Sequence, residues 1–334
     1  MATAGHLLLL LGCAGVIYLA CEWFVNAVEW LGIRLRMGTL AVGTVLAAIG
    51  TALPESVVTL VAVTLGGTES SKQIGIGAAM GGPLVLATIA YGVTGWMLIR
   101  HRATVGPNPL RSIDRLRLVS DQTWFLAIFV VKVGLGLVAF ALKPWLGLLF
   151  FAAYGAYFRR EMRADTEAHT DADLEPLKLQ PHRTAPAGWA VAVQSVLTLA
   201  VIFGASQVFV GQLEWAGPAL GLPAAVTALL LSPIATELPE VMNAVIWVRQ
   251  GKTQLALANI SGAMMIQATV PSGLGLLFTP WLFNAPLVLS GMVTMAAIGY
   301  LLWLGRTSRL TPGRLAFAAA FYGIFIVGLA LLGV

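Results

Sequence analysis

Charge is scarce in this chain of 334 residues: Asp, Glu, Lys and Arg make up 10% of it, and 58% of the residues are hydrophobic. A soluble domain carries roughly 25% charged residues, so the composition excludes an ordinary soluble protein. Cysteine is nearly absent, and its two copies, Cys13 and Cys21, fall in one apolar run, where we expect them to pack. The formal net charge of +5 comes from basic residues in loops between apolar runs, so we expect no nucleic-acid partner.

Signatures of enzyme chemistry are also lacking. The sequence has no HExxH, GxSxG or GxGD motif and no ATP-binding P-loop. The histidines suggest no metal cluster, because they fall at the N-terminus or in expected loops: His6, His101, His169 and His182. We therefore expect neither an enzyme nor a bound cofactor, and any transport would be driven by an ion gradient.

Ten apolar runs could cross a membrane. A span takes about 20 apolar residues. Backbone groups in lipid must be satisfied internally, so continuous apolar runs predict helices, whereas a barrel would need alternating residues. The predicted spans lie near 7–31, 37–64, 73–99, 122–141, 143–158, 187–212, 222–248, 253–278, 286–304 and 312–333. The expected fold class is an all-α integral membrane protein with ten transmembrane helices.

The basic residues divide unequally between the two sides of this predicted bundle. Of the 20 lysines and arginines, only Lys72 and Lys143 fall on one side, and Lys132 lies inside the fourth span. The positive-inside rule places the basic side in the cytoplasm and both termini on the opposite side. We predict a multi-pass protein of the inner (plasma) membrane, with residues 159–186 forming a solvated cytoplasmic loop.

The sequence contains an internal repeat. Residues 20–55 align with residues 205–240 at a constant offset of 185. Both copies contain Glu-Trp-x-Gly and Thr-x-Leu-Pro-Glu, and the second motif ends at Glu55 in one copy and at Glu240 in the other. Shared apolar bias does not produce two polar motifs at a common offset, so the repeat is a true duplication.

The two copies are predicted to have opposite orientations in the membrane. Each copy starts a half of five spans, the first over residues 1–158 and the second over residues 187–334. Because five is odd, the second half enters the membrane from the opposite side. The sequence therefore predicts two inverted-topology five-helix repeats, and transporters of this kind bind substrate near the midplane, where the repeats meet.

The repeated motif places a carboxylate in the middle of the second and seventh spans. A Glu at this depth is costly and indicates function, which applies to both Glu55 and Glu240. Each follows a proline, which frees the helix carbonyl four residues earlier. Thr51 and Thr236 lie one turn before these carboxylates and share their helix faces. Carboxylate, hydroxyl and carbonyl oxygens suit calcium, magnesium or sodium, and they do not suit zinc or copper.

The second copy carries an additional carboxylate. Glu237 lies three residues before Glu240 on nearly the same face, where the first copy has Ala52. Three carboxylates facing one site would exceed the charge of one divalent ion, so one of them could stay protonated. Alternatively, Glu237 forms a hydrogen bond elsewhere in the bundle. The sequence leaves both interpretations open.

At these residues the chain resembles the calcium/cation antiporter superfamily, and specifically the sodium/calcium exchanger membrane-region family. The family carries two Gly-Thr-Ser-Leu-Pro-Glu type motifs, which read Gly-Thr-Ala-Leu-Pro-Glu over 50–55 and Ala-Thr-Glu-Leu-Pro-Glu over 235–240. A further segment, Leu-Ala-Asn-Ile-Ser-Gly over 257–262, is similar to the family's Leu-Ala-x-Gly-Asn-Ile-x-Gly-Ser-Asn segment.

The resemblance implies roles for individual residues. Glu55 and Glu240 match the acidic pair that binds calcium and sodium alternately, and the two motif threonines would contribute oxygens beside them. Gln267 falls where the family often has an acidic or amide residue, and Asn259 matches a motif asparagine. The complete set of expected ion-site residues is Glu55, Glu240, Thr51, Thr236, Glu237, Gln267, Asn259 and Ser232.

The sequence also departs from the family pattern. In the first repeat the family's serine and asparagine appear as Gly82 and Leu86, and Ala52 and Glu237 replace motif serines. Part of the usual sodium coordination is therefore missing. The leading prediction is an antiporter that exports calcium in exchange for sodium by alternating access. The alternative is proton-coupled export of calcium or another divalent cation. Expected partners are calcium, sodium or protons and the lipid bilayer, with no obligate protein partner.

Overall fold

The computed structural model describes residues 2–34, 48–106, 109–110, 113–164 and 175–333, and its regular secondary structure there is helical, as expected. The first half contains α1 (Ala2–Arg34), α3 (Ala48–Thr64), α4 (Glu69–Val85), η2 (Leu86–Ala90), α5 (Tyr91–Arg100), α6 (Arg102–Val105), α7 (Arg115–Gly136), η3 (Lys143–Leu146) and α8 (Gly147–Ala164). The second half contains α9 (Gly188–Leu220), α10 (Ala224–Thr236), α11 (Leu238–Arg249), α12 (Thr253–Phe278), α13 (Ala285–Arg306), α14 (Pro312–Ala316) and α15 (Ala319–Leu331).

Seven helical stretches within the described ranges are long and apolar enough to span a membrane. They are Gly5–Phe24, Glu69–Arg100, Arg115–Gly136, Gly188–Leu220, Thr253–Phe278, Ala285–Arg306 and Pro312–Leu331. The other three predicted spans fall on α3, on α8 and on the α10–α11 pair, which are shorter, more polar or broken. The membrane class is confirmed, and the count of ten remains a prediction.

The fourth predicted span, 122–141, is displaced along the chain. Helix α7 begins at Arg115, where the Asp114 side chain caps it by accepting a hydrogen bond from the Arg117 backbone N–H at 2.9 Å. The helix ends at Gly136, well before the residue predicted. The cap explains the early start, because it satisfies a backbone donor that the first turn leaves free.

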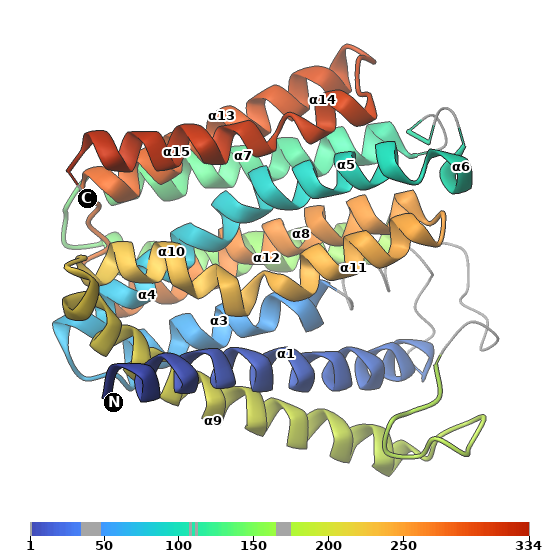
Figure 1. The fold of residues 1–334 in the computed structure, drawn as a ribbon, viewed down its shortest axis with the longest axis horizontal. Helices are drawn as coiled ribbons and strands as arrows, with labels where there is room; N and C mark the ends of the chain where they lie inside the picture. The colour runs from blue at the N-terminus through green and yellow to red at the C-terminus, as the bar shows by residue number, and fades with distance from the viewer. Residues whose placement is uncertain (1, 35–47, 107–108, 111–112, 165–174, 334) are drawn as a thin grey trace.

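The helices form a layered bundle whose two ends differ (Figure 1). Helices α1 and α9 pack along each other at one face, and α7, α13 and α15 cover the opposite face. Between them, α3 packs on α12 and α4 packs on α10. Both termini lie at one end of the bundle, and the turns that follow α5, α11 and α13 lie at the other.

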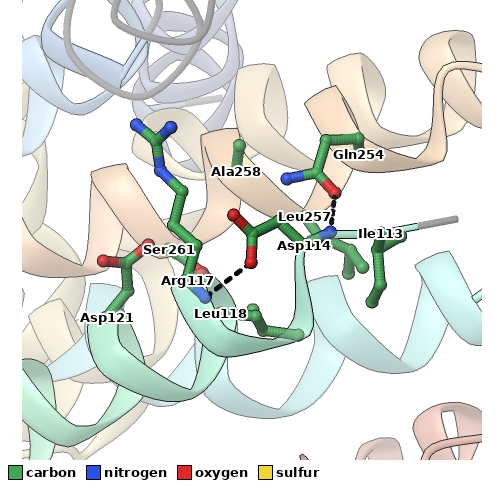
Figure 2. A pocket seen from close by; sticks show the side chains of 9 residues that line it. All are labelled: Ile113, Asp114, Arg117, Leu118, Asp121, Gln254, Leu257, Ala258 and Ser261. Carbon is green, nitrogen blue, oxygen red and sulfur yellow. Dashed lines mark hydrogen bonds between the residues drawn. The ribbon is translucent and has the colours of Figure 1, made fainter. Parts of the chain in front are cut away.

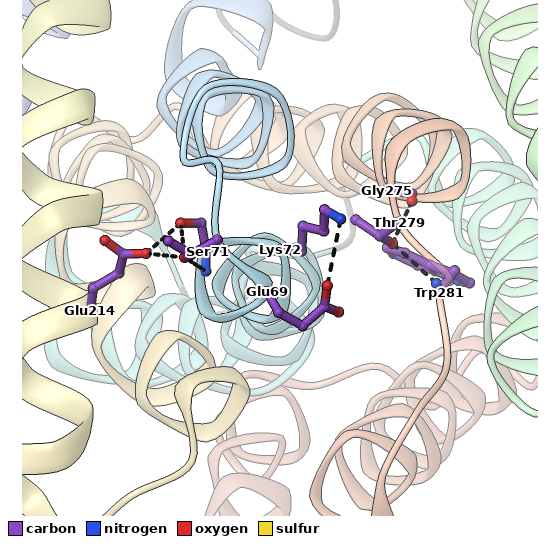
Figure 3. A network of polar contacts seen from close by, with 8 residues as sticks. Glu69, Ser71, Lys72, Glu214, Gly275, Thr279 and Trp281 are labelled. Atoms are coloured by element: carbon purple, nitrogen blue, oxygen red, sulfur yellow. Dashed lines mark hydrogen bonds and ion pairs between the residues drawn. The ribbon is translucent and has the colours of Figure 1, made fainter.

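The N-terminus of α4 is tied to α9 by a carboxylate (Figure 3). Thr68 caps α4 by accepting a hydrogen bond from the Ser71 backbone N–H at 2.9 Å, and its hydroxyl donates to Glu214 Oε1 at 2.6 Å. The Ser71 hydroxyl also donates to Glu214. Glu214 belongs to the repeated Glu-Trp-x-Gly motif, so this copy of the motif anchors a helix start. The side chain of its counterpart Glu29 lies outside the described residues.

The seventh predicted span, 222–248, is two helices rather than one. Glu237 ends α10 and precedes α11, with backbone φ −100° and ψ −8°. Pro239 follows in the first turn of α11 and has no N–H with which to continue the hydrogen-bond ladder of α10. The break therefore places the extra carboxylate of the second repeat at the junction between two helices.

Candidate ion-binding site

Glu237 contacts residues of two helices, α10 and α12, through its two carboxyl oxygens. Its Oε1 lies 2.8 Å from the Thr236 hydroxyl at the end of α10. Its Oε2 accepts a hydrogen bond from the side-chain amide of Gln267, on α12, at 2.7 Å. All three side chains are buried, and 1% of Glu237 is exposed. The sequence left the partners of this carboxylate open, and the structure brings it to two other predicted site residues.

The carboxylate of the first repeat meets the same threonine. Glu55, on α3, is fully buried, and its Oε2 lies 2.9 Å from the Thr236 hydroxyl. Thr236 thus links Glu55 to Glu237, so that residues from the two copies of the repeat share one polar cluster. A third oxygen, the carbonyl of Ser232, lies 3.2 Å from the same hydroxyl.

The hydrogen bonds of Thr236 require a proton that the hydroxyl itself does not supply. A hydroxyl has one proton and can donate to only one of its three neighbouring oxygens. With both Glu55 and Glu237 ionised, a carboxylate oxygen would face the lone pairs of the hydroxyl. A proton on either carboxyl places a hydrogen between that carboxyl and Thr236. The geometry therefore has a place for one exchangeable proton at this cluster.

Gly82, on α4, makes room for the cluster. A β-carbon added at Gly82 would lie 2.7 Å from Gln267 Oε1 and 2.9 Å from Glu237 Oε1, both closer than real β-carbons approach such atoms. The resemblance placed a family serine at this position, and the departure now has a structural meaning. The volume of the absent side chain is occupied by the two polar groups that the second repeat supplies. The sequence did not predict that Gly82 lies against Glu237, although Gly82 was identified there as a departure from the family's serine.

The remaining predicted site residues are placed less closely. Glu240 is fully buried in the first turn of α11. Asn259 is fully buried on α12 two turns before Gln267, and neither its amide nor the Ser232 hydroxyl has a hydrogen-bond partner within the described ranges. The side chain of Thr51, on α3, lies outside the described residues.

A cluster of three carboxylates around one point is not observed. The described part of the chain contains no group of three or more His, Cys, Asp and Glu side chains arranged to hold a metal ion. What the structure brings together is Glu55, Glu237, Thr236 and Gln267. Oxygens buried without a partner, such as Gln267 Oε1 and the Ser232 hydroxyl, are suitable ligands for a hard cation.

A second polar site lies where α7 begins beside α12 (Figure 2). The backbone N–H of Asp114 donates to Gln254 Oε1 at 2.7 Å, and Asp121 lies one turn beyond Arg117 in the same small pocket. Arg117 also forms an ion pair with Glu161, on α8, of which 1% is exposed. These contacts join the start of α7 to α12 and α8, near the end of the bundle where the basic turns lie. Arg117 and the Asp114 cap therefore explain the pocket as a junction between helices.

Comparison with known proteins yields consistent similarities. The family model described as sodium/calcium exchanger protein matches residues 5–159 and 190–332. The inner membrane protein YrbG of Escherichia coli (strain K12) is 28% identical over 343 aligned residues, covering 99% of this chain and 97% of that protein. The putative antiporter CaxA of Alkalimonas amylolytica is 24% identical over 268 residues, covering 80% and 78%.

Two kinds of solved structure share the fold. A sodium-calcium exchanger, NCX_Mj, soaked with 10 mM Na⁺ and zero Ca²⁺, matches with a TM-score of 0.64 at 19% identity, covering 97% of each chain. The H⁺/Ca²⁺ exchanger CAX matches with a TM-score of 0.74 at 16% identity, covering 97% of this chain and 82% of that one. At these identities the structures establish the fold, and the coupling ion has to be argued from the site.

Proposed function

The chain belongs to the sodium/calcium exchanger protein family, and from this membership we propose that it exports calcium across the inner membrane by alternating access. It is a multi-pass membrane cation antiporter and not an enzyme. The direction of transport, the membrane and the coupling ion belong to the proposal. So does the division into halves over 1–158 and 187–334, joined by a cytoplasmic loop over 159–186.

We propose ten spans in two inverted repeats, with both termini outside the cytoplasm. The repeat offset of 185 relates α1 to α9, α3 to α11 and α4 to α12. Packing follows the same relation, since α12 contacts α7 and α8 much as α4 and α5 contact α13 and α14. The basic turns share one end of the bundle, which the positive-inside rule assigns to the cytoplasm (Figure 1).

For the coupling ion we propose the proton, carried at the Glu55–Thr236–Glu237 cluster. The observation that carries this proposal is the single Thr236 hydroxyl between two buried carboxyl groups. Calcium binding would require both carboxylates in the ionised form, and their return to the observed hydrogen-bonded arrangement would require a proton. Calcium and the proton would therefore compete for the same oxygens, and this competition couples their fluxes.

Sodium is the second candidate, and it was the leading prediction from the sequence. It is favoured by the hard oxygen ligands of the cluster and by the carbonyl of Leu229, which Pro233 deprives of its helical donor. That carbonyl lies close to Gly81, where a β-carbon would approach it to 2.7 Å. The glycine at position 82, in place of a family serine, weighs against sodium because one expected oxygen is missing.

The test is calcium uptake into proteoliposomes driven separately by a pH gradient and by a sodium gradient. We expect the pH gradient to drive uptake by the unmodified protein, and protonophore to abolish it. Glu237→Gln, which cannot exchange a proton at position 237, should lower this uptake at least about 100-fold, the scale of a lost general acid–base group. Glu55→Gln should abolish exchange with either gradient.

Glu69→Gln is the matched control, because Glu69 is an exposed carboxylate at the start of α4. It should transport like the unmodified protein. Uptake driven by sodium and insensitive to protonophore, with Glu237→Gln fully active, would establish sodium coupling and refute the proton. Wild-type exchange by Glu55→Gln would refute the site. Uptake by neither gradient would refute calcium as the cargo.

A further inference from the structure

Lys132 is fully buried about one turn before the C-terminal end of α7. The sequence placed this lysine inside the fourth predicted span, and in the structure its side chain is buried in the protein. Its Nζ donates to the carbonyl oxygen of Ala79, on α4, at 2.7 Å and lies 3.4 Å from that of Gln267, on α12. The ammonium therefore bridges the two helices that lie on either side of it.

Both carbonyls lack the backbone N–H that normally donates to a carbonyl in a helix interior. Ala79 would pair with the backbone N–H four residues later, and that residue is Pro83; Gln267 would likewise pair with Pro271. Proline has no N–H, so each carbonyl loses its helical partner. In the interior of a membrane protein such a carbonyl needs another donor or a cation. The two prolines thus create a pair of convergent oxygens.

Two aromatic rings also lie near the ammonium. Lys132 Nζ lies 5.1 Å from the centre of the Phe129 ring and 6.0 Å from that of Trp281. The Trp281 indole N–H donates to the Lys132 carbonyl at 3.3 Å, which fixes the ring beside the lysine backbone. No carboxylate among the described residues forms an ion pair with Lys132 within 4.0 Å. Carbonyl oxygens and aromatic ring faces both attract a monovalent cation such as an ammonium group.

This cation site shares residues with the candidate ion-binding site. Gln267 offers its backbone carbonyl to Lys132 and its side-chain amide to Glu237. Ala79 lies one turn before Gly82, which faces the same Glu237 and Gln267 side chains. Gln267 therefore contacts both the fixed positive charge of Lys132 and Glu237, one of the carboxyl groups that the proposed exchange uses.

We propose that the Ala79 and Gln267 carbonyls form a monovalent-cation site that Lys132 fills permanently, as a tethered substitute for a bound ion. Glu55 and Glu237, which form the neighbouring cluster with Thr236, are buried, as Lys132 is. Ionised, these two carboxylates carry two negative charges, and Lys132 offsets one of them. One proton then neutralises the cluster together with the lysine, so the lysine sets the number of protons that the cluster takes up when no other cation is bound. This last step rests on the proposed antiport, whereas the cation site itself does not.

The experiment replaces the lysine side chain by a free amine. Lys132→Ala lacks three side-chain carbons and the ammonium, and n-propylammonium supplies three carbons and an ammonium. We expect n-propylammonium to raise the melting temperature of the purified variant and to restore its calcium exchange at least about tenfold, the scale of one charge-assisted hydrogen bond. Propan-1-ol, which has the same shape without the charge, should do neither.

Lys143→Ala is the matched control. Lys143 also donates to two backbone carbonyls, those of Val138 at 2.6 Å and Trp281 at 3.0 Å, but it lies in the turn between α7 and α8. The amine should not restore exchange in this variant. Wild-type exchange by Lys132→Ala without amine, or equal rescue by propan-1-ol, would overturn the proposal.

A second variant separates charge from folding. Pro83→Ala with Pro271→Ala returns a backbone donor to each carbonyl, so adding Lys132→Met to this pair gives a chain that does not need the ammonium for its helices. We expect it to fold and to exchange calcium poorly, and wild-type exchange would overturn the inference. The amine-dependent melting temperature of Lys132→Ala tests the cation site even if the unmodified protein proves not to transport calcium.

Discussion

Gly82→Ala should disturb the ion site through a single methyl group. The new β-carbon would lie 2.7 Å from Gln267 Oε1 and 2.9 Å from Glu237 Oε1, where ordinary van der Waals contact begins near 3.4 Å. Both atoms end flexible side chains, so they can move, but moving them breaks the 2.7 Å hydrogen bond between Gln267 and Glu237 or the 2.8 Å contact with Thr236. The substitution therefore acts on the polar cluster rather than on the backbone of α4.

The expected magnitude follows from two opposing effects. Overpacking a buried position costs about 1–3 kcal/mol. Replacing Gly by Ala inside a helix returns roughly 1 kcal/mol. We therefore expect Gly82→Ala to destabilise the protein by up to about 2 kcal/mol and to slow calcium exchange. In a Glu237→Ala background the same substitution should be neutral or stabilising, because the carboxylate is gone and the Gln267 amide, no longer held by its hydrogen bond to Glu237, can move away from the new methyl group.

A double-mutant cycle measures this coupling. The four proteins would be compared by thermal unfolding in detergent, and a coupling free energy of about 1–3 kcal/mol is expected for side chains in direct contact. Gly134→Ala, on α7, is the control for helix propensity, because a β-carbon there meets nothing within 4 Å. Additive effects, with Gly82→Ala equally costly in both backgrounds, would refute the claim that Gly82 accommodates Glu237.

Two further predictions concern the scaffold. Glu214→Ala removes the acceptor of the Thr68 and Ser71 hydroxyls and should lower stability by about 2 kcal/mol, while calcium exchange per folded molecule stays unchanged; a loss of exchange without a loss of thermal stability would contradict this anchoring role. Arg117→Met leaves the buried Glu161 without its arginine partner and should cost roughly 3–5 kcal/mol, and adding Glu161→Gln should recover most of that loss in the same unfolding assay; no recovery would show that the arginine acts through other contacts.

The sequence alone determined the class of this protein and the origin of its site. The low charge and the long apolar runs require a helical membrane protein, since lipid offers no partner for backbone groups. The common offset of 185 identified Glu55 and Glu240 as equivalent positions, because polar motifs do not recur by apolar bias. Helix boundaries were less certain, and the α10–α11 break appeared as one span because apolar composition continues through it.

Only the tertiary structure decided which candidate residues meet. Glu55 and Thr236 come from different copies of the repeat, and their contact depends on how α3 and α10 pack. Helix faces can be read from the chain, but partners across helices depend on register and side-chain rotamers that packing fixes. Asn259 was also predicted for the site, but its amide has no hydrogen-bond partner in the part of the chain that the structure describes.

The surroundings of Lys132 show most clearly what the sequence determines and what the tertiary structure determines. The sequence alone shows that Pro83 and Pro271 each leave a carbonyl without its helical donor, because proline has no backbone N–H. The sequence does not show that the carbonyls of Ala79 and Gln267, 188 residues apart, both contact one lysine from a third helix. The covalent structure determines which hydrogen-bonding groups each residue provides, and the packing of the helices determines which of these groups come into contact.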